Sequence, residues 1–294
     1  MSAHESPTVI IGHDMSPELA VDVSIALHGM GVVVKTNGVS PGARHTKVIA
    51  VISPKGGSGK TAISANLAVA LAQRFPGQVV AVDLDLQFGD LATALSLTPE
   101  RSLAQLTRTP QIDATTVKLF LTPHDSGLFV MAGANDPVDA DSVGQAHVAE
   151  VLPLLAQNFD YVIVDTPAGL DERTLAAIDC ATDLLLVSSL DVTSIRSLRK
   201  ALDALDRIGV KASRRLVLNR ADSKVGLDPS DAEEAIGMKI ACSIPSSREV
   251  PLSLNFGTPV VVSEPRSAVA KQMQQLAQVY AAVEPAKAKK GWRR

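Results

Sequence analysis

The feature that most constrains this chain is the segment SPKGGSGKT, residues 53–61, which lies between an apolar run and an amphipathic run. The run before it, KVIAVIS, is β-branched and almost wholly apolar, which predicts a buried strand. After it, Ile63, Leu67 and Leu71 recur at helical spacing and predict an amphipathic helix. The segment therefore predicts a strand, a glycine-rich turn and a helix start in immediate succession, which is the context of a phosphate-binding loop.

Strands and helices alternate along most of the chain. Short β-branched runs predict seven strands, at residues 47–53, 78–85, 127–133, 161–165, 183–189, 214–219 and 239–244. Amphipathic segments lie between them, and Pro153 interrupts one of these, which predicts a kinked or restarted helix. This alternation predicts a doubly wound, mainly parallel α/β sheet with helices on both faces.

The domain organisation follows from changes in pattern. Residues 1–45 resemble a single strand-helix-strand unit, which is too short to bury a core of its own. Residues 46–283 are expected to form the main domain, and residues 284–294 a loose basic tail.

Composition excludes several classes of protein. No uninterrupted apolar run reaches the roughly 18 residues that span a bilayer, and the first residues lack the pattern of a secretory signal, which predicts a cytoplasmic protein. Cys180 and Cys242 stand far apart, so neither a disulfide framework nor a zinc knuckle is expected. A net charge of −3 gives no general attraction to nucleic acid or membranes.

The glycine-rich turn predicts a nucleotide site. Its glycines let backbone N–H groups point inward at phosphate oxygens, and the helix that follows adds the positive end of its dipole. Lys60 is expected to neutralise the β- and γ-phosphates, and the Thr61 hydroxyl to ligate Mg²⁺. The alternative is a strand-helix turn with an incidental lysine. The residues expected to bind nucleotide here are Gly56, Gly57, Ser58, Gly59, Lys60 and Thr61.

One departure from the ordinary GxxxxGK[ST] pattern points to a particular family. Pro54 replaces the first glycine and Lys55 follows it, so that the loop resembles the deviant Walker A family of MinD, ParA, the arsenite-pump ATPases and the nitrogenase iron protein. The resemblance implies an ATPase that dimerises when ATP binds. It also implies that Lys55 of each protomer acts in catalysis by reaching the phosphates bound to the other.

Three carboxylates at predicted strand ends complete the expected site. Asp83 and Asp85 stand two residues apart and therefore point the same way. By resemblance, Asp85 orients or deprotonates the attacking water, whereas Asp83 supports Thr61 and the Mg²⁺ shell. For Asp83 the alternative is an ordinary carboxylate of a loop. Asp165, which ends YVIVD, resembles the Walker B aspartate that holds Mg²⁺ through water, and the next four residues resemble the second switch loop.

The base-reading residue is expected at Asn219, whose amide offers both a donor and an acceptor to adenine. The surrounding NRAD also resembles the NKxD element of GTP-binding proteins, in which Asp222 would read guanine. The rest of the pattern favours ATP. Pro245 is expected to wall the base, or else to be a simple turn residue.

Within the family, DLDLQFGD after the loop looks most like the CpaE or TadZ branch, which localises the assembly of Flp-type pili at the cell pole. That branch implies a slow ATPase switch, a pilus or secretion partner, and a position at the pole or at the inner face of the membrane. Residues 1–45 would then be a truncated receiver-like remnant.

Two other roles remain open. A MinD-like role in placing the division site would use the tail for at most peripheral membrane contact, through five cationic residues and Trp292. A ParA-like role would need DNA binding by the basic side of residues 196–207, which Asp203 and Asp206 dilute, so DNA is possible but not favoured.

Overall fold

The computed structural model describes residues 8–11, 33–36, 46–134, 136, 138–222 and 226–282. Contacts divide the chain into two compact units, Met1–Arg44 and His45–Arg294. In the first unit, strand β1 (Thr8–Ile11) pairs in parallel with β2 (Val33–Thr36). The helix expected between these strands and the basic tail at 284–294 lie outside the described residues.

The second unit is built on an eight-stranded sheet with the order β10-β9-β8-β3-β7-β4-β6-β5. All seven predicted strands are present and parallel, which confirms the expected doubly wound class. They are β3 (Lys47–Ile52), β4 (Val79–Asp83), β6 (Leu128–Met131), β7 (Tyr161–Asp165), β8 (Asp183–Ser189), β9 (Ser213–Asn219) and β10 (Ile240–Ile244). The eighth, β5 (Thr122–Pro123), adds an antiparallel edge, and two residues are too few to leave a sequence pattern.

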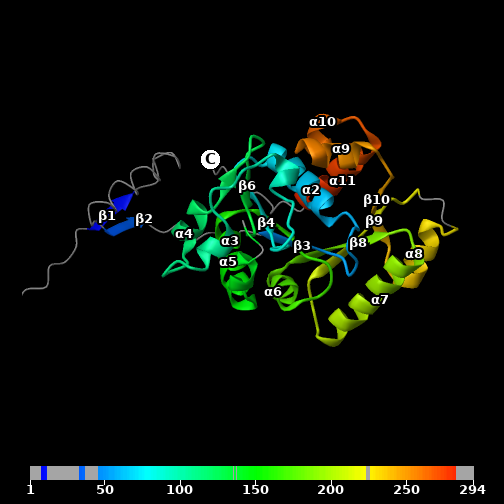
Figure 1. Ribbon diagram of the computed structural model, residues 1–294, viewed down its shortest axis with the longest axis horizontal. Coiled ribbons are helices and arrows are strands. Elements are labelled where there is room, and N and C mark those ends of the chain that lie inside the picture. Colours follow the sequence, from blue (N-terminus) through cyan, green and yellow to red (C-terminus); the bar gives the residue numbers. More distant parts are fainter. Residues whose placement is uncertain are drawn as a thin grey trace, which may run out of the picture. The chain divides into compact units, whose positions relative to one another are not determined.

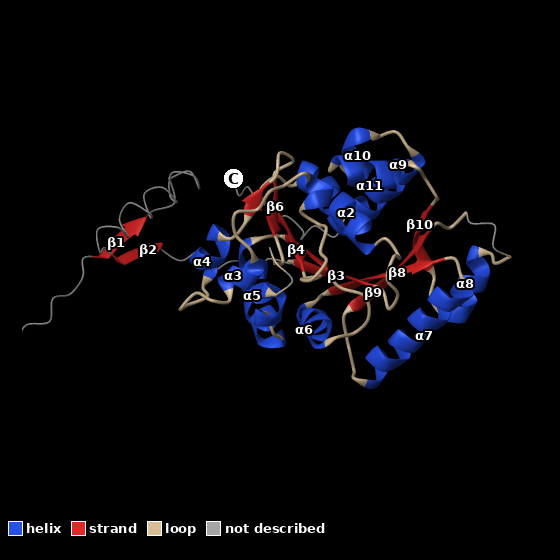
Figure 2. Cartoon of the chain, in the orientation of Figure 1, coloured by secondary structure: helices blue, strands red, loops and turns tan. Residues whose placement is uncertain are grey.

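Helices cover both faces of the sheet, as Figures 1 and 2 show. One face carries α2 (Lys60–Arg74), α9 (Glu249–Phe256), α10 (Val260–Ser263) and α11 (Ala268–Ala281). The other carries α3 (Leu103–Leu106), α4 (Ala114–Leu119), α5 (Gln145–Asn158), α6 (Glu172–Cys180), α7 (Val192–Arg207) and α8 (Pro229–Ile236). Two short 3₁₀ turns, η1 (Thr93–Leu95) and η2 (Asp139–Ser142), lie in the connections. No helix in the described part of the chain combines the length and apolar character needed to cross a bilayer.

The central strand β3 is buried on both sides, which explains its continuous apolar sequence. Ile49 and Val51 face the core under α2 and α11, whereas Ala50 and Ile52 face the core under α7 and α8. The alternation follows from the two-residue repeat of a strand. Both faces must therefore be apolar, and polar groups concentrate where the strands end.

Helix α5 differs from its prediction. It runs as one helix from Gln145 to Asn158, although Pro153 lies inside it, so the expected restart is wrong. Pro153 is exposed, which leaves the carbonyl that loses its partner free to face water.

The helix layer around α2 is joined by a buried amide. Asn66 is 2% exposed, and its Nδ2 donates to the Ala62 carbonyl at 2.8 Å while its Oδ1 accepts the Val261 N–H at 3.0 Å. Because Val261 is in α10, this side chain connects α2 to the segment that follows β10.

The end of α11 is anchored at the amino edge of the sheet. The carboxylate of Asp183 is fully buried and pairs with Arg215 and, at 3.3 Å, with Lys47. The Arg215 guanidinium lies 4.8 Å from the centre of the Tyr280 ring. This cation–π contact holds the last turn of α11 over the starts of β8 and β9.

The amide bridge generates a prediction about stability. Changing Asn66 to Ala leaves the Val261 N–H buried without its acceptor, so we expect the free energy of unfolding to fall by about 1–3 kcal/mol. Urea denaturation measures this. The control is Asn255→Ala, since Asn255 is exposed on α9 and its loss should change stability by less than about 0.5 kcal/mol. Equal effects of the two changes would contradict the bridging role.

Candidate functional site

The glycine-rich turn between β3 and α2 adopts a backbone that its glycines require. Gly57 and Gly59 have φ angles of 69° and 93°, in the left-handed region. A Cβ on Gly59 would lie 2.4 Å from Nδ2 of Asn219, so this position also lacks room for a side chain. The turn is therefore shaped both by its own conformation and by the end of β9.

Lys60 begins α2 and is 8% exposed. Burial lowers the pKa of its ammonium group, and the nearby carboxylates of Asp165 and Asp85 oppose that shift. A cation held in this way, at the start of a helix and beside a turn of backbone N–H groups, suits a polyanionic ligand.

Asp165 lies at the end of β7. Of the two nearby carboxylates, it has the larger effect on the pKa of Lys60. It is 1% exposed, and its Oδ1 accepts a hydrogen bond from Ser64 at 2.9 Å. Burial raises its pKa to about 6, although hydrogen bonds from Thr61 and Ser64 and the charge of Lys60 lower it. Among the described residues, none offers Oδ2 a hydrogen bond of normal geometry. A buried carboxylate oxygen left open in this way calls for a cation or a bound water.

Asp83 ends the neighbouring strand β4, and Asp85 lies in the loop after it, in a different environment. Asp83 pairs in register with Asp165 and is 3% exposed. Its Oδ1 accepts the Asp85 N–H at 3.0 Å, and its Oδ2 accepts the Leu91 N–H at 3.2 Å. Burial, followed by the charge of Asp165, raises the pKa of Asp83 well above its usual value. Asp83 therefore holds the loop that follows β4, whereas Asp85 is only partly buried and near enough to Lys60 to affect it.

Gly89 completes this loop. A Cβ at Gly89 would lie 2.4–2.5 Å from both carboxylate oxygens of Asp83. The loop thus closes directly over the buried carboxylate, and only a residue without a side chain fits there.

Lys55 points to the side of the turn, toward the start of α7. Its Nζ lies 3.2 Å from Oδ1 of Asp191 and 2.8 Å from the Thr193 hydroxyl. Asp191 also caps α7, because it accepts the Ser194 N–H at 2.9 Å. The Lys55 side chain is 46% exposed. Its ion pair with Asp191 is therefore open to solvent and weak.

The loop after β9 reaches back to the phosphate loop. Asn219 Nδ2 donates to the Ser58 carbonyl at 2.8 Å. Asp222 Oδ1 accepts the Ser246 N–H at 2.6 Å, which fixes the segment that follows β10. Pro245 begins that segment and is partly buried. The expected base-reading residues therefore lie together at the carboxyl edge of β9 and β10.

The loop after β7 is also tied to the phosphate loop. The Thr166 hydroxyl donates to the Val51 carbonyl at 2.8 Å, and the Gly169 N–H donates to the Ser53 carbonyl at 3.0 Å. Gly169 has a φ of 96°. This segment, expected to be the second switch, is thus connected to the strand that precedes the glycines.

The fold brings all the residues expected from the sequence to one edge of the sheet. Two contributors, Ser64 and Asp191, were not predicted from the spacing of residues in the sequence. Ser64 follows Lys60 by one helical turn, and Asp191 follows a strand just as Asp83 and Asp165 do, so both could have been found by the same reasoning.

The basic side of α7 is partly neutralised. Arg199 pairs with Asp203 at 3.0 Å, and Arg214 pairs with Asp206 at 2.6 Å. Arg215 is engaged with the buried Asp183. These pairs reduce the positive charge that a nucleic acid would meet on this surface.

The residues present fit Mg²⁺ held together with a phosphate ligand. Among the described residues there is no cluster of three or more His, Cys, Asp or Glu side chains that would hold a metal alone. Mg²⁺ typically takes one or two protein groups and completes its shell with phosphate oxygens and water. The open Asp165 oxygen beside Thr61 meets that requirement.

Comparisons with known proteins cover more than half of the chain. A family model described as AAA domain matches residues 46–218. An uncharacterized ATP-binding protein of Methanocaldococcus jannaschii is 28% identical over 229 residues, covering 78% of this chain and 85% of that protein. A ParA family ATPase structure from Chlorobium tepidum has a TM-score of 0.75 at 25% identity, covering 80% of this chain and 99% of the other. The septum site-determining protein MinD of Pyrococcus horikoshii, solved with Mg-ADP, has a TM-score of 0.73 at 25% identity, with coverages of 83% and 99%.

The raised pKa of Asp165 predicts a particular dependence of stability on pH. Its folded pKa of about 6 exceeds the unfolded value of 3.8, so its contribution to stability is complete below pH 3.8 and is lost as the pH rises through 6. Asp165→Asn should therefore leave the metal-free protein unchanged near pH 4 and stabilise it near pH 8, by on the order of 3 kcal/mol.

Urea denaturation in the presence of a chelator measures this difference at the two pH values. Asp113→Asn is the control, because hydrogen bonds from Thr116 lower the pKa of Asp113, so that its loss brings no gain at pH 8. An Asp165→Asn protein that is less stable than the parent at pH 8 would contradict the account.

Proposed function

The chain belongs to the AAA domain family, and from that premise we propose that it is a MinD/ParA-like ATPase that works as a dimeric switch. The observation that carries this proposal is the buried Asp165 carboxylate, with one open oxygen, beside Lys60 and Thr61 at the end of a glycine-rich turn. The names of the similar proteins, an ATP-binding protein, a ParA family ATPase and MinD with Mg-ADP, support the same activity.

The binding roles follow from position. Backbone N–H groups of residues 56–61 surround the β- and γ-phosphates, and the ammonium group of Lys60 neutralises them. Thr61 would hold Mg²⁺ directly and Asp165 through water, and the ion would supply positive charge to the phosphate oxygens. The burial of Lys60 strengthens its attraction to the phosphates, because water screens it less.

The loop after β4 supplies the hydrolytic residue. Asp83 keeps this loop in place through the N–H groups of Asp85 and Leu91. Asp85 is thereby held near Lys60 and positions or deprotonates the water that attacks the γ-phosphate. In this proposal Asp83 positions the loop and Asp85 acts in the reaction.

Lys55 supplies the second cation from the partner protomer. Within one protomer it contacts Asp191 and Thr193, and these contacts are exposed and therefore weak. Transfer to the partner's phosphates replaces them with a charge-assisted hydrogen bond to a doubly charged group. Dimerisation then depends on bound triphosphate, and loss of the γ-phosphate releases the partner.

The nucleotide is ATP in this proposal, with Asn219 reading the base and Pro245 beside it. Asp222, the residue that would read guanine, already accepts the Ser246 N–H, which supports the choice of ATP over GTP.

The switch positions a partner assembly, and DLDLQFGD favours a CpaE/TadZ-like role at a Flp-type pilus and secretion machinery. Turnover is slow, since the product is a change of conformation. MinD-like division-site placement and ParA-like DNA partitioning are the alternatives.

The ATPase domain spans residues 46–283, with residues 1–45 and 284–294 outside it. The protein acts in the cytoplasm, at the pole or against the inner face of the membrane.

The role of Lys55 can be separated from ATP binding. Lys55→Ala should weaken the ATP-dependent dimer by at least about tenfold, equivalent to about 1.4 kcal/mol, with little change in ATP affinity. Analytical ultracentrifugation with a non-hydrolysable ATP analogue measures the dimer. Lys211→Ala, which removes an exposed lysine, should have no effect. Asp191→Asn keeps the helix cap but frees Lys55, so its dimer should be at least as tight as the parent's. A Lys55→Ala dimer of full strength would exclude the trans role.

The role of Asp85 predicts that its loss slows hydrolysis but leaves the dimer intact, unlike the loss of Lys55. Asp85→Ala should lower the hydrolysis rate roughly 100-fold or more and leave the protein as an ATP-bound dimer, because the water is no longer positioned. Phosphate release and dimer content are measured on the same samples. Asp90→Ala, an exposed neighbour in the same loop, is the matched control. Undiminished turnover in the Asp85→Ala protein would remove Asp85 from the reaction.

A further inference from the structure

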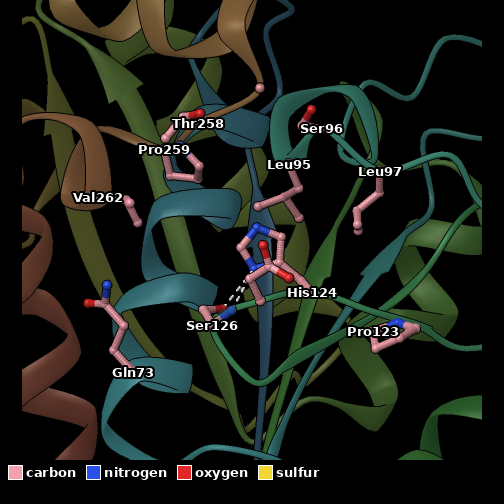
Figure 3. A pocket seen from close by; sticks show the side chains of 12 residues that line it. Gln73, Leu95, Ser96, Leu97, Pro123, His124, Ser126, Thr258, Pro259 and Val262 are labelled. Carbon is pink, nitrogen blue, oxygen red and sulfur yellow. Dashed lines mark hydrogen bonds between the residues drawn. The ribbon is translucent and has the colours of Figure 1, made fainter.

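A hollow lies at the opposite end of α2 from the phosphate loop (Figure 3). Its volume of about 710 Å³ is within the range of ligand pockets. Gln73, near the last turn of α2, contributes to its wall, together with residues 95–97, 123–126 and 257–259. A helix of the length of α2 separates it from Lys60 by about 20 Å. The hollow therefore takes no part in holding the phosphates.

The lining combines apolar surface with a few polar groups. Leu95, Leu97 and Val262 supply apolar contacts. His124 Nδ1 accepts the Ser126 N–H at 3.2 Å, so the hydrogen of the neutral ring is on the other nitrogen, which points away from Ser126 into the hollow (Figure 3). Burial lowers the pKa of His124, against the effect of the nearby Asp125 charge, and keeps the ring neutral near pH 7.

The charge of the hollow favours a basic occupant. Asp125 is the one lining residue that is charged near pH 7, and it is exposed at the surface. The occupant that fits should therefore present an apolar ring to the hollow and positive charge beside Asp125.

We propose that this hollow docks the chain's own segment 283–294, with the Trp292 indole inside and the flanking basic side chains near Asp125. Trp292 is the only tryptophan of the chain, and five cationic residues surround it, namely Lys287, Lys289, Lys290, Arg293 and Arg294. The apolar lining takes the ring, and Ser96 and Gln73 offer acceptors for the indole N–H.

The segment begins close enough to the hollow for Trp292 to reach it. Gln73 lines this hollow and also a neighbouring depression that Gln274 and Gln278 of α11 border. The end of α11 therefore lies beside the same end of α2 that carries the hollow. Trp292 lies ten positions after Ala282, and an extended chain spans up to about 33–36 Å over that length.

Docking would brace two segments that begin at the nucleotide edge. Residues 84–97 lead from β4 to one wall, and residues 245–262 lead from β10 to another. The two meet where Gly257 lies against Ser96, since a Cβ on Gly257 would be 2.7 Å from the Ser96 backbone nitrogen. A ring in the hollow would rest on both segments at this junction.

The single tryptophan makes the test direct, and the full chain is used without nucleotide. We expect acrylamide to quench Trp292 fluorescence severalfold less in the native protein than in the same protein unfolded in urea. Val262→Arg places a charge in the hollow that repels both the ring and the basic segment, so quenching should rise to the unfolded level. Val279→Arg is the matched control, because both valines are 43% exposed and only Val262 lines the hollow.

A second variant tests the charge. Asp125→Lys should raise quenching in the same direction as Val262→Arg, and high salt should do so in the parent. The docking is overturned if native Trp292 is quenched as readily as in urea, or if the two arginine variants change quenching equally. Protection that grows with protein concentration would assign the segment to a second copy and would also overturn docking within one chain.

Discussion

The arrangement of this edge of the protein depends on a buried carboxylate that its surroundings satisfy only in part. Asp165 ends a wholly buried strand, pairs with Ser64 through one oxygen and leaves the other open. Raising a carboxyl pKa from 3.8 to about 6 corresponds to on the order of 3 kcal/mol against its charged form. A fold keeps such a group where a cation, bound with a ligand, removes the penalty. Lys60 offsets only part of it, because the pKa of Asp165 stays raised despite the nearby ammonium group.

The loops around this carboxylate are connected to the phosphate loop by hydrogen bonds and an ion pair. The phosphate loop contacts the loop after β7 through Ser53, the loop after β8 through Lys55 and the loop after β9 through Ser58. Each contact consists of one or two hydrogen bonds or ion pairs. A change in charge at the phosphates therefore reaches three loops at once, whereas the strands beneath them stay packed. This is the arrangement that a switch needs, since the moving parts are held by weak contacts on a rigid support.

Much of the fold could be predicted from the sequence, because strands and helices each leave a recognisable pattern of apolar residues. The seven parallel strands were found from β-branched runs, since burial on both faces leaves a nearly continuous apolar pattern. The strand β5 has two residues and no pattern, and the continuity of α5 through Pro153 depends on which side of the helix faces water. Neither can be derived from a single sequence.

The location of the site residues could be predicted from the sequence to a similar degree. Glycine spacing and acids at strand ends located its members, because parallel strands end at one edge. The hydrogen-bond and ion-pair partners of those residues could not be predicted in the same way. That Asp83 binds the Asp85 and Leu91 N–H groups, and that Lys55 contacts Asp191, depend on how loops from different strands meet.

In the function proposed above, Lys60 and Asp165 together hold a magnesium-bound triphosphate. Titration calorimetry of the full chain with ATP, with Mg²⁺ or with a chelator, tests it most directly. The account predicts binding that weakens at least about tenfold, or about 1.4 kcal/mol, when Mg²⁺ is removed, and that is lost in a Lys60→Ala protein. Absence of binding by the parent chain with Mg²⁺ present, or binding indifferent to both changes, would contradict it.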